Sequence, residues 1–210
     1  MKIINLSEQT SIMNRYVAEL RDVTIQGDRL RFKRNVERIG ELMAYEISKT
    51  FQYQSTEIQT PLAVSHDMLD QNKVVVATIL RAGLPLHQGF TNALDRAENA
   101  FVTAYRKYID NEHFEVKVEY LSSPNIGGKT LIITDPMLAT GRSMELSYHA
   151  LLTKGSPKEL HIAAVISSQV ALDYLEEHMP ADTTLWTAAI DPAVDEHSYI
   201  VPGLGDAGDL

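Results

Sequence analysis

The sequence predicts an α/β fold in which a mostly parallel, twisted sheet is flanked by helices on both faces. Nearly unbroken apolar runs at residues 73–80 and 161–168 have the length and composition of strands that are buried on both sides. Helical and strand-like patterns alternate along the chain, which is typical of βαβ units. With 210 residues, of which 44% are hydrophobic and 22% charged, the chain suits a single globular domain.

The first half of the chain contains one long predicted helix and one buried strand. Residues 31–51 carry apolar side chains at helical spacing, and residues 73–80 form the strand. Residues 56–61 are expected to be a short extended segment between them. A shorter helix should follow the strand at about residues 86–92.

The second half begins with a predicted strand at residues 101–105. Residues 114–120 alternate between apolar and polar side chains, as the arm of an exposed hairpin does. A buried strand is predicted at residues 131–134, a helix at 143–152 and a last strand at 161–168.

The stretch LIITDPMLATGRSMEL, residues 131–146, carries the strongest functional signal. Its apolar strand must end near Pro136, which lacks an amide donor, and a helix begins at about Ser143. The segment between them offers free backbone amides and the positive end of a helix dipole, which suit a phosphate monoester. The hydroxyls of Thr140 and Ser143 either add donors for this anion or cap the helix, and both interpretations remain open.

The loops that follow the predicted strands should meet, because ligands of parallel sheets bind at the carboxyl ends of the strands. Three loops are expected there, at residues 81–83, 105–106 and 135–143. Together they supply Arg81, Arg106 and one carboxylate beside the phosphate segment. This collection fits a substrate with a monophosphate and a second, more highly charged polyanion.

The formal charge of -9 argues against nucleic acid as the main partner, because phosphate backbones need a positive face. One basic cluster is interpreted as a solvated helix face rather than a nucleic-acid site. It comprises Arg29, Arg31, Lys33, Arg34 and Arg38.

The sequence predicts a cytoplasmic protein without a membrane partner. It has no apolar run of the roughly 18 residues that span a bilayer, and its first residues are too polar for a secretory signal. It has no cysteine, and no His or Asp cluster has the spacing of a dedicated metal site.

Short motifs spread over nearly the whole chain identify it as similar to the uracil phosphoribosyltransferase family. This resemblance implies a type I phosphoribosyltransferase fold that spans residues 1–210 as a single domain, with a small hood from about residues 1–30 and 185–210. The motifs, in order, are LRD at Leu20, LMAYEIS at Leu42, TPL at Thr60, ILRAGLPL at Ile79, AYR at Ala104, DPMLATG at Asp135 and YIVPGLGDAGD at Tyr199.

The resemblance implies the conversion of uracil and 5-phospho-α-D-ribose 1-diphosphate (PRPP) to UMP and diphosphate in pyrimidine salvage. It further implies Mg²⁺ carried by the diphosphate, a homodimer or higher homo-oligomer, and GTP as a candidate effector. The alternatives are a regulatory homologue that binds nucleotide or RNA with weak catalysis, and a purine or orotate phosphoribosyltransferase.

The family resemblance also assigns residues to the two substrates. The catalytic residues would be Arg81, Arg106 and Asp206. The uracil site would consist of Tyr199, Ile200, Gly205, Asp206 and Ala207. The PRPP site would consist of Arg81, Ala82, Gly83, Arg106, Asp135, Pro136, Met137, Leu138, Ala139, Thr140, Gly141, Arg142, Ser143 and Asp206.

Within this implied site, Arg81 and Arg106 would bind the diphosphate, and Asp135 would accept hydrogen bonds from ribose hydroxyls. The resemblance leaves two roles open for Asp206, a metal-linked or water-linked contact to the diphosphate and handling of the proton on the attacking nitrogen. The hairpin at about residues 105–120 would close over the site and exclude water.

The sequence departs from the family pattern at three places. Arg142 stands where the family usually has glycine, and its side chain is expected to point outward because backbone forms the phosphate cradle. Lys107 follows Arg106 where relatives have Asn or Asp, which affects the length and closure of the hairpin. Relatives continue beyond the position of Leu210, so a less firmly packed base loop and lower activity are expected.

Overall fold

A computed structural model describes the backbone of residues 1–108 and 114–208, and the side chains of these residues except 104–108 and 114–118. Its central sheet has eight strands in the order β1-β10-β9-β7-β4-β5-β6, with the short β8 beside β9. The strands are β1 (Lys2–Asn5), β4 (Val74–Ile79), β5 (Glu98–Tyr108), β6 (Phe114–Ser122), β7 (Thr130–Thr134), β8 (Met137–Leu138), β9 (Glu159–Ser168) and β10 (Thr184–Asp191).

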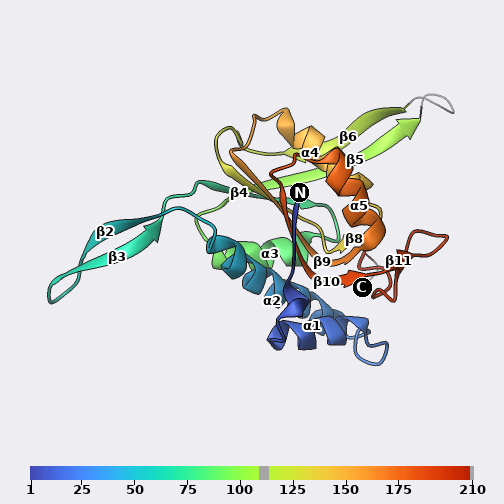
Figure 1. The fold of residues 1–210 in the computed structure, drawn as a ribbon, viewed down its shortest axis with the longest axis horizontal. Helices are drawn as coiled ribbons and strands as arrows, with labels where there is room; N and C mark the ends of the chain where they lie inside the picture. The colour runs from blue at the N-terminus through green and yellow to red at the C-terminus, as the bar shows by residue number, and fades with distance from the viewer. Residues whose placement is uncertain (109–113, 209–210) are drawn as a thin grey trace.

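The predicted mostly parallel sheet with helices on both faces is confirmed. Within this sheet the β5–β6 pair is antiparallel, whereas the other pairs are parallel. Helices α1, α2 and α3 cover one face, and α4 and α5 cover the other (Figure 1). Their bounds are α1 (Ile12–Arg21), α2 (Arg29–Ser48), α3 (Leu84–Ala93), α4 (Arg142–Leu152) and α5 (Gln169–His178).

Alternation along the buried strands divides the core into two layers. In β4, Val74 and Val76 point toward the α1–α3 layer, whereas Val75 and Ala77 point toward the α4–α5 layer. Successive strand residues face opposite sides of a sheet, so a strand that is apolar throughout supplies both layers. The prediction of a buried strand from the nearly unbroken apolar run at residues 73–80 is therefore confirmed.

Helix α2 begins and ends earlier than the predicted range of 31–51. It starts at Arg29 because the carboxylate of Asp28 accepts a hydrogen bond from the amide of Arg31 and caps the helix. Helix α3 is one turn longer than expected, since it begins at Leu84 with Pro85 in its first turn.

The prediction of a loop at residues 105–106 is wrong, because this segment is part of strand β5. β5 continues to Tyr108 and pairs with β6 as an antiparallel hairpin, in which Arg106 lies opposite Val116. Pairing with a neighbouring strand satisfies the backbone beyond the point where the apolar run ends. The hairpin predicted from residues 114–120 is confirmed, while residues 109–113 lie outside the described part.

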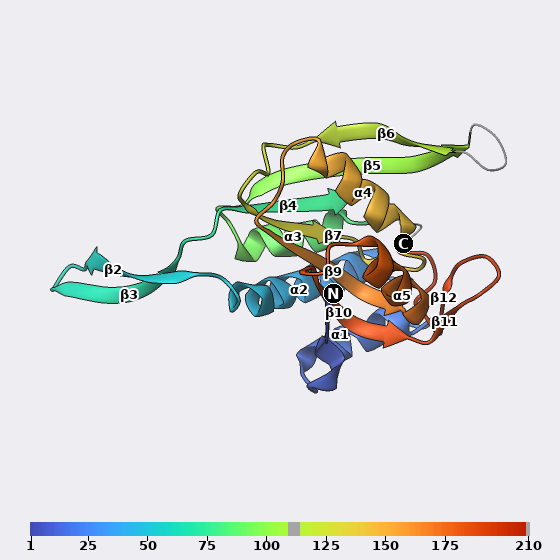
Figure 2. The same ribbon diagram turned by 45° about the horizontal axis from the view of Figure 1, so that its top comes forward.

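A second hairpin, formed by β2 (Tyr53–Gln59) and β3 (Val64–Asp70), projects from the body of the molecule (Figure 1). The sequence predicts only a short extended segment at residues 56–61, whereas the structure has a full hairpin here. Figure 2 shows that this hairpin, called the arm below, extends well beyond the end of α2. Leu62 at its tip is 96% exposed.

The two terminal segments expected to form a hood each contribute a strand to the central sheet. β1 pairs with β10 at one edge, and β10 in turn pairs with β9. The remaining parts, η1 (Leu6–Glu8) with α1 and the strands β11 (Ala193–Val194) and β12 (Ile200–Val201), lie outside the sheet. Within the described residues, no helix is long and apolar enough to cross a bilayer.

Candidate active site

Three of the segments predicted to bind ligand meet at one cavity of about 420 Å³. Arg81 and Ala82 follow β4, Pro136 follows β7, and Ala207 comes from the C-terminal segment after β12. β4 and β7 are parallel neighbours, so their carboxyl ends lie at the same edge of the sheet. The side chain of Arg106 lies outside the described residues.

The segment from Asp135 to Ser143 lines a second, smaller cavity of about 80 Å³ at the start of α4. The residue before α4 is Gly141, and no side chain accepts a hydrogen bond from the first turn of this helix. The interpretation of Thr140 and Ser143 as helix caps is therefore wrong. Both line the cavity instead, where uncapped amides and hydroxyls converge as phosphate binding requires.

Gly141 is required by both its conformation and its surroundings. Its φ of 75° lies in the left-handed region, and a Cβ here would approach Leu175 Cγ to 2.9 Å. Leu175 belongs to α5, which packs against the loop. The hydroxyl of Ser168 at the start of α5 also donates a hydrogen bond to the carbonyl of Ala139 at 2.6 Å. Helix α5 thus holds the loop in place through this hydrogen bond to Ala139 and through its packing against Gly141.

Asp135 is the carboxylate at the entrance of this loop. Burial raises its pKa from 3.8 to about 7, and a hydrogen bond from the amide of Met137 opposes this rise. A carboxyl group with a strongly perturbed pKa in a cavity is a candidate functional group. It follows β7 directly and lines the small cavity.

Six described residues of the predicted site line neither of these two cavities: Gly83 and Arg142 near the sheet edge, and Tyr199, Ile200, Gly205 and Asp206 in the C-terminal segment. Arg142 is exposed at the start of α4 and does not line the small cavity, which agrees with the outward orientation expected of it. Gly83 is buried, and a Cβ there would collide with the hydroxyl of Thr78. Close packing at the end of β4 therefore explains this glycine.

The C-terminal segment proposed for uracil is ordered by backbone turns. Ile200 is 3% exposed and anchors β12, whereas Tyr199 and Asp206 are exposed. Asp206 accepts a hydrogen bond from the amide of Gly208 at 2.7 Å. Within the described chain, the backbone amides and carbonyls of Gly205 and Ala207 make no hydrogen bond, so they are available to bind a ligand.

Sequence reasoning missed the residues that hold this segment in place. Arg21 of α1 makes two hydrogen bonds of 2.7 Å to the carboxylate of Asp191 and a third of 2.8 Å to the carbonyl of Gly203. Asp191 also accepts a hydrogen bond from the amide of Gly203. The LRD motif contains Arg21, and Asp191 precedes a proline, but nothing in the sequence indicates that they pair.

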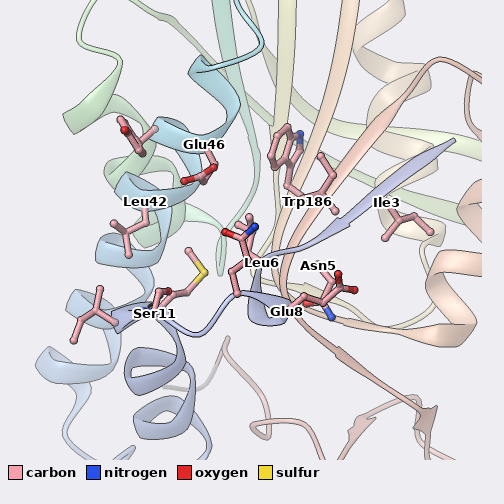
Figure 3. Close-up of a pocket in the computed structure, with 13 residues that line it drawn as sticks. Ile3, Asn5, Leu6, Glu8, Ser11, Leu42, Glu46 and Trp186 are labelled. Carbon is pink, nitrogen blue, oxygen red and sulfur yellow. Dashed lines mark hydrogen bonds between the residues drawn. The ribbon is translucent and has the colours of Figure 1, made fainter.

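Cavity size alone does not locate this site. A larger cavity of about 490 Å³ lies between the N-terminal segment, α2 and β10, where Leu6, Leu42 and Trp186 face one another (Figure 3). None of the predicted site residues line it. Among the described residues, no group of three or more His, Cys, Asp or Glu side chains is placed to hold a metal ion.

Known structures agree with this architecture. A protein from Aquifex aeolicus superimposes with a TM-score of 0.85 at 26% identity, covering 99% of this chain and 96% of that one. Orotate phosphoribosyltransferase from Mycobacterium tuberculosis, solved with PRPP, shares the fold with a TM-score of 0.54 at 15% identity, covering 88% and 92% of the two chains. The fold is that of the type I phosphoribosyltransferases.

Sequence comparison narrows the class to one family. The model of uracil phosphoribosyltransferase matches residues 7–210. Uracil phosphoribosyltransferase from Porphyromonas gingivalis is 62% identical over 210 residues, which cover all of this chain and 97% of the relative. The enzyme of that name from Pyrobaculum arsenaticum is 39% identical and covers 86% of each chain. The chain belongs to the uracil phosphoribosyltransferase family.

Proposed function

We propose that this protein transfers the 5-phosphoribosyl group of PRPP to uracil, giving UMP and diphosphate in pyrimidine salvage. The observation that carries this proposal is the meeting of Arg81, Pro136 and Ala207 at one cavity, beside the uncapped start of α4. These segments are the ones that the family resemblance assigns to diphosphate, ribose phosphate and base. Family membership over the whole chain supports the same activity.

The segment from Ala139 to Ser143 would bind the 5'-phosphate of the donor. Amides of the first turn of α4 and the hydroxyls of Thr140 and Ser143 supply its hydrogen bonds. Asp135 would accept hydrogen bonds from the ribose hydroxyls. These contacts place the anomeric carbon between the diphosphate and the base.

In the reaction, the N1 nitrogen of uracil forms a bond to the anomeric carbon while the bond from that carbon to the diphosphate oxygen breaks. The electron pair leaves with the diphosphate, and the N1 proton is released. Because the sugar passes through a cation-like state, the protein contributes mainly positioning and stabilisation of the leaving group. Arg81 would supply positive charge there, together with Arg106.

The C-terminal segment would select the base through its backbone. Gly205, Asp206 and Ala207 offer amides and carbonyls to the alternating carbonyl, N–H and carbonyl edge of uracil. Cytosine presents an amino group and an unprotonated nitrogen at the corresponding positions, so backbone groups would remain unpaired. Such polar recognition discriminates strongly. A backbone group that is buried by cytosine without a hydrogen-bond partner has lost its bond to water and gains none in exchange.

Mg²⁺ would enter with the substrate, chelated by the diphosphate oxygens. Magnesium in phosphate-transfer sites usually has only one or two protein carboxylates and keeps several waters. Asp206 and Asp135 are the carboxylates of the proposed site that would add such a ligand directly or through water. Asp206 would alternatively receive the N1 proton.

The proposal is tested by measuring diphosphate release from PRPP and Mg²⁺ with uracil, cytosine, hypoxanthine and orotate offered separately. We expect turnover with uracil to exceed that with cytosine by at least about a hundredfold. If the protein binds PRPP but turns over none of the four bases, the regulatory alternative replaces this proposal.

We further propose that the protein is a homodimer or a higher homo-oligomer. A two-stranded hairpin alone is marginally stable in water, yet the arm exposes Tyr53, Leu62, Val64 and Met68. Packing against a second copy would bury these side chains. Sedimentation should give at least twice the 23.5 kDa mass of one chain, and a sedimenting monomer would contradict the proposal.

The remaining family expectations are proposals of the same kind. The single domain would carry a hood from about residues 1–30 and 185–210, of which the parts from Leu6 to Asp28 and from residue 192 onward lie outside the sheet. The protein would act in the cytoplasm, with GTP as a candidate effector. Adding GTP to the uracil assay tests the last point directly, because an activator raises turnover at low PRPP.

A further inference from the structure

The cavity of about 420 Å³ has a basic wall that the proposed site does not use. Helix α2 contributes Arg29 and Lys33, together with Phe32 and Val36, and these four residues line the same cavity as Arg81 and Ala82. Phe32 and Val36 are buried, whereas both basic residues are exposed. Residues three and four apart share one face of a helix, so the first two turns of α2 present this wall as a unit.

The basic residues of this cluster differ in their partners. Arg31 forms an ion pair with Glu19, and Arg34 forms one with Glu37. Arg38 donates a hydrogen bond to Asn35 and lies over the ring of Tyr16. Three of the five cations are thus accommodated within the protein, as the interpretation of a solvated helix face predicts.

Arg29, Lys33 and Arg81 have no such partner. Within the described chain, none of these three side chains makes a hydrogen bond or an ion pair. The chain carries a net charge of -9, so carboxylates are abundant, yet among residues 1–108 and 114–208 none lines this cavity. Cations gathered around a cavity without counter-charge repel one another and attract a polyanion.

We propose that Arg29 and Lys33, together with Arg81, bind the diphosphate group of PRPP and of the product. This inference rests on the proposed function, because Arg81 and Ala82 mark the cavity as the diphosphate side. The group carries more charge than one guanidinium neutralises, so cations from α2 and from the loop after β4 would share it. The 5'-phosphate, in contrast, belongs to the other cavity at the start of α4.

The proposal predicts which ligands depend on the two residues. PRPP and free diphosphate both contain the diphosphate group, whereas UMP contains only the base, the ribose and the 5'-phosphate. Lys33→Gln and Arg29→Gln should therefore weaken binding of PRPP and diphosphate, and leave binding of UMP unchanged. A general disturbance of the fold would weaken all three ligands.

The test is calorimetric titration of the full chain with PRPP, Mg²⁺-diphosphate and UMP in turn, without purine nucleotides. We expect each single variant to raise the dissociation constants of PRPP and diphosphate by about tenfold, and the double variant by more. Glutamine favours helix, so α2 should persist. Arg34→Gln is the matched control, because it removes the same charge from α2 outside the cavity.

Two outcomes would overturn the inference. One is that Lys33→Gln and Arg29→Gln bind diphosphate as Arg34→Gln does, and the other is that binding of UMP weakens to the same extent. Because this titration needs no turnover, it is separate from the uracil assay. A protein that binds diphosphate through these residues but leaves uracil unchanged would contradict only the proposed function.

Discussion

Replacing Arg21 by methionine is expected to lower the free energy of unfolding by about 3 kcal/mol. The side chain of Asp191 is 5% exposed, and the substitution removes the cation that makes two hydrogen bonds to it. A buried carboxylate without its partner keeps the full cost of desolvation. The value is placed at the lower end of the usual range because the Arg21 side chain is 24% exposed.

The same substitution should disturb binding of the base more than binding of the donor. Arg21, Asp191 and Gly203 are joined by four hydrogen bonds, which connect α1 to the C-terminal segment. We expect the KM for uracil to rise by about tenfold, with a smaller change for PRPP.

Chemical unfolding and steady-state kinetics of Arg21→Met measure both effects. The matched control is Arg31→Met, which also breaks a two-bond pair with a carboxylate, that of Glu19. Arg31 is half exposed, and surface pairs of this kind contribute little to stability. Equal losses of stability in the two variants would contradict the structural role assigned to Arg21.

Replacing Asp135 by asparagine is expected to stabilise the protein without substrate at alkaline pH. The pKa of this carboxyl is about 7 in the folded protein and near 3.8 in the unfolded chain. Between these two values the folded state binds more protons than the unfolded state. The free energy of unfolding of the wild type therefore falls as pH rises through this window, and then stays at the lower level.

Asparagine has no charge to bury, so the variant should lack this fall in stability. A pKa difference of this size corresponds to at most about 4 kcal/mol, and we expect about 2 kcal/mol at pH 8 because Asp135 is partly exposed. At pH 4 the two proteins should be nearly equally stable. Turnover should fall by about tenfold or more, because the charged acceptor for the ribose hydroxyls is lost.

Denaturant unfolding of Asp135→Asn and wild type at pH 4, 6 and 8 checks this expectation. Asp173→Asn provides a comparison at an exposed aspartate on α5. If Asp135→Asn were less stable than the wild type at pH 8, burial would not be the dominant influence on this carboxyl.

The element that the sequence predicted best is the strand, turn and helix around residues 131–152. Its apolar strand, Pro136 and the helical pattern after Ser143 are all local, and the structure differs from the expected helix start by one residue. The sequence left the roles of Thr140 and Ser143 open. The left-handed Gly141, which α5 packs against, decided that neither caps the helix.

Other features could not be predicted because they depend on pairing between distant segments. The strand pattern at residues 101–105 gave no reason to extend β5 through Arg106, because pairing with β6 supports that part of the strand. The sequence likewise predicted only part of the arm. Its strands β2 and β3 bury few side chains on either face, so their sequences carry only a weak apolar pattern.

By itself, the sequence determined the alternating α/β order, the central buried strands and the strand, turn and helix order around the loop after β7. These follow from spacing within one segment, where side-chain periodicity and turn chemistry act over a few residues. The tertiary structure alone decided that Arg21 holds Asp191 and Gly203, and that Arg29 and Lys33 line one cavity with Arg81 while their neighbours Arg31 and Arg34 are paired. Contacts between residues as many as 182 positions apart depend on how whole elements pack, and that packing leaves no local pattern in the chain.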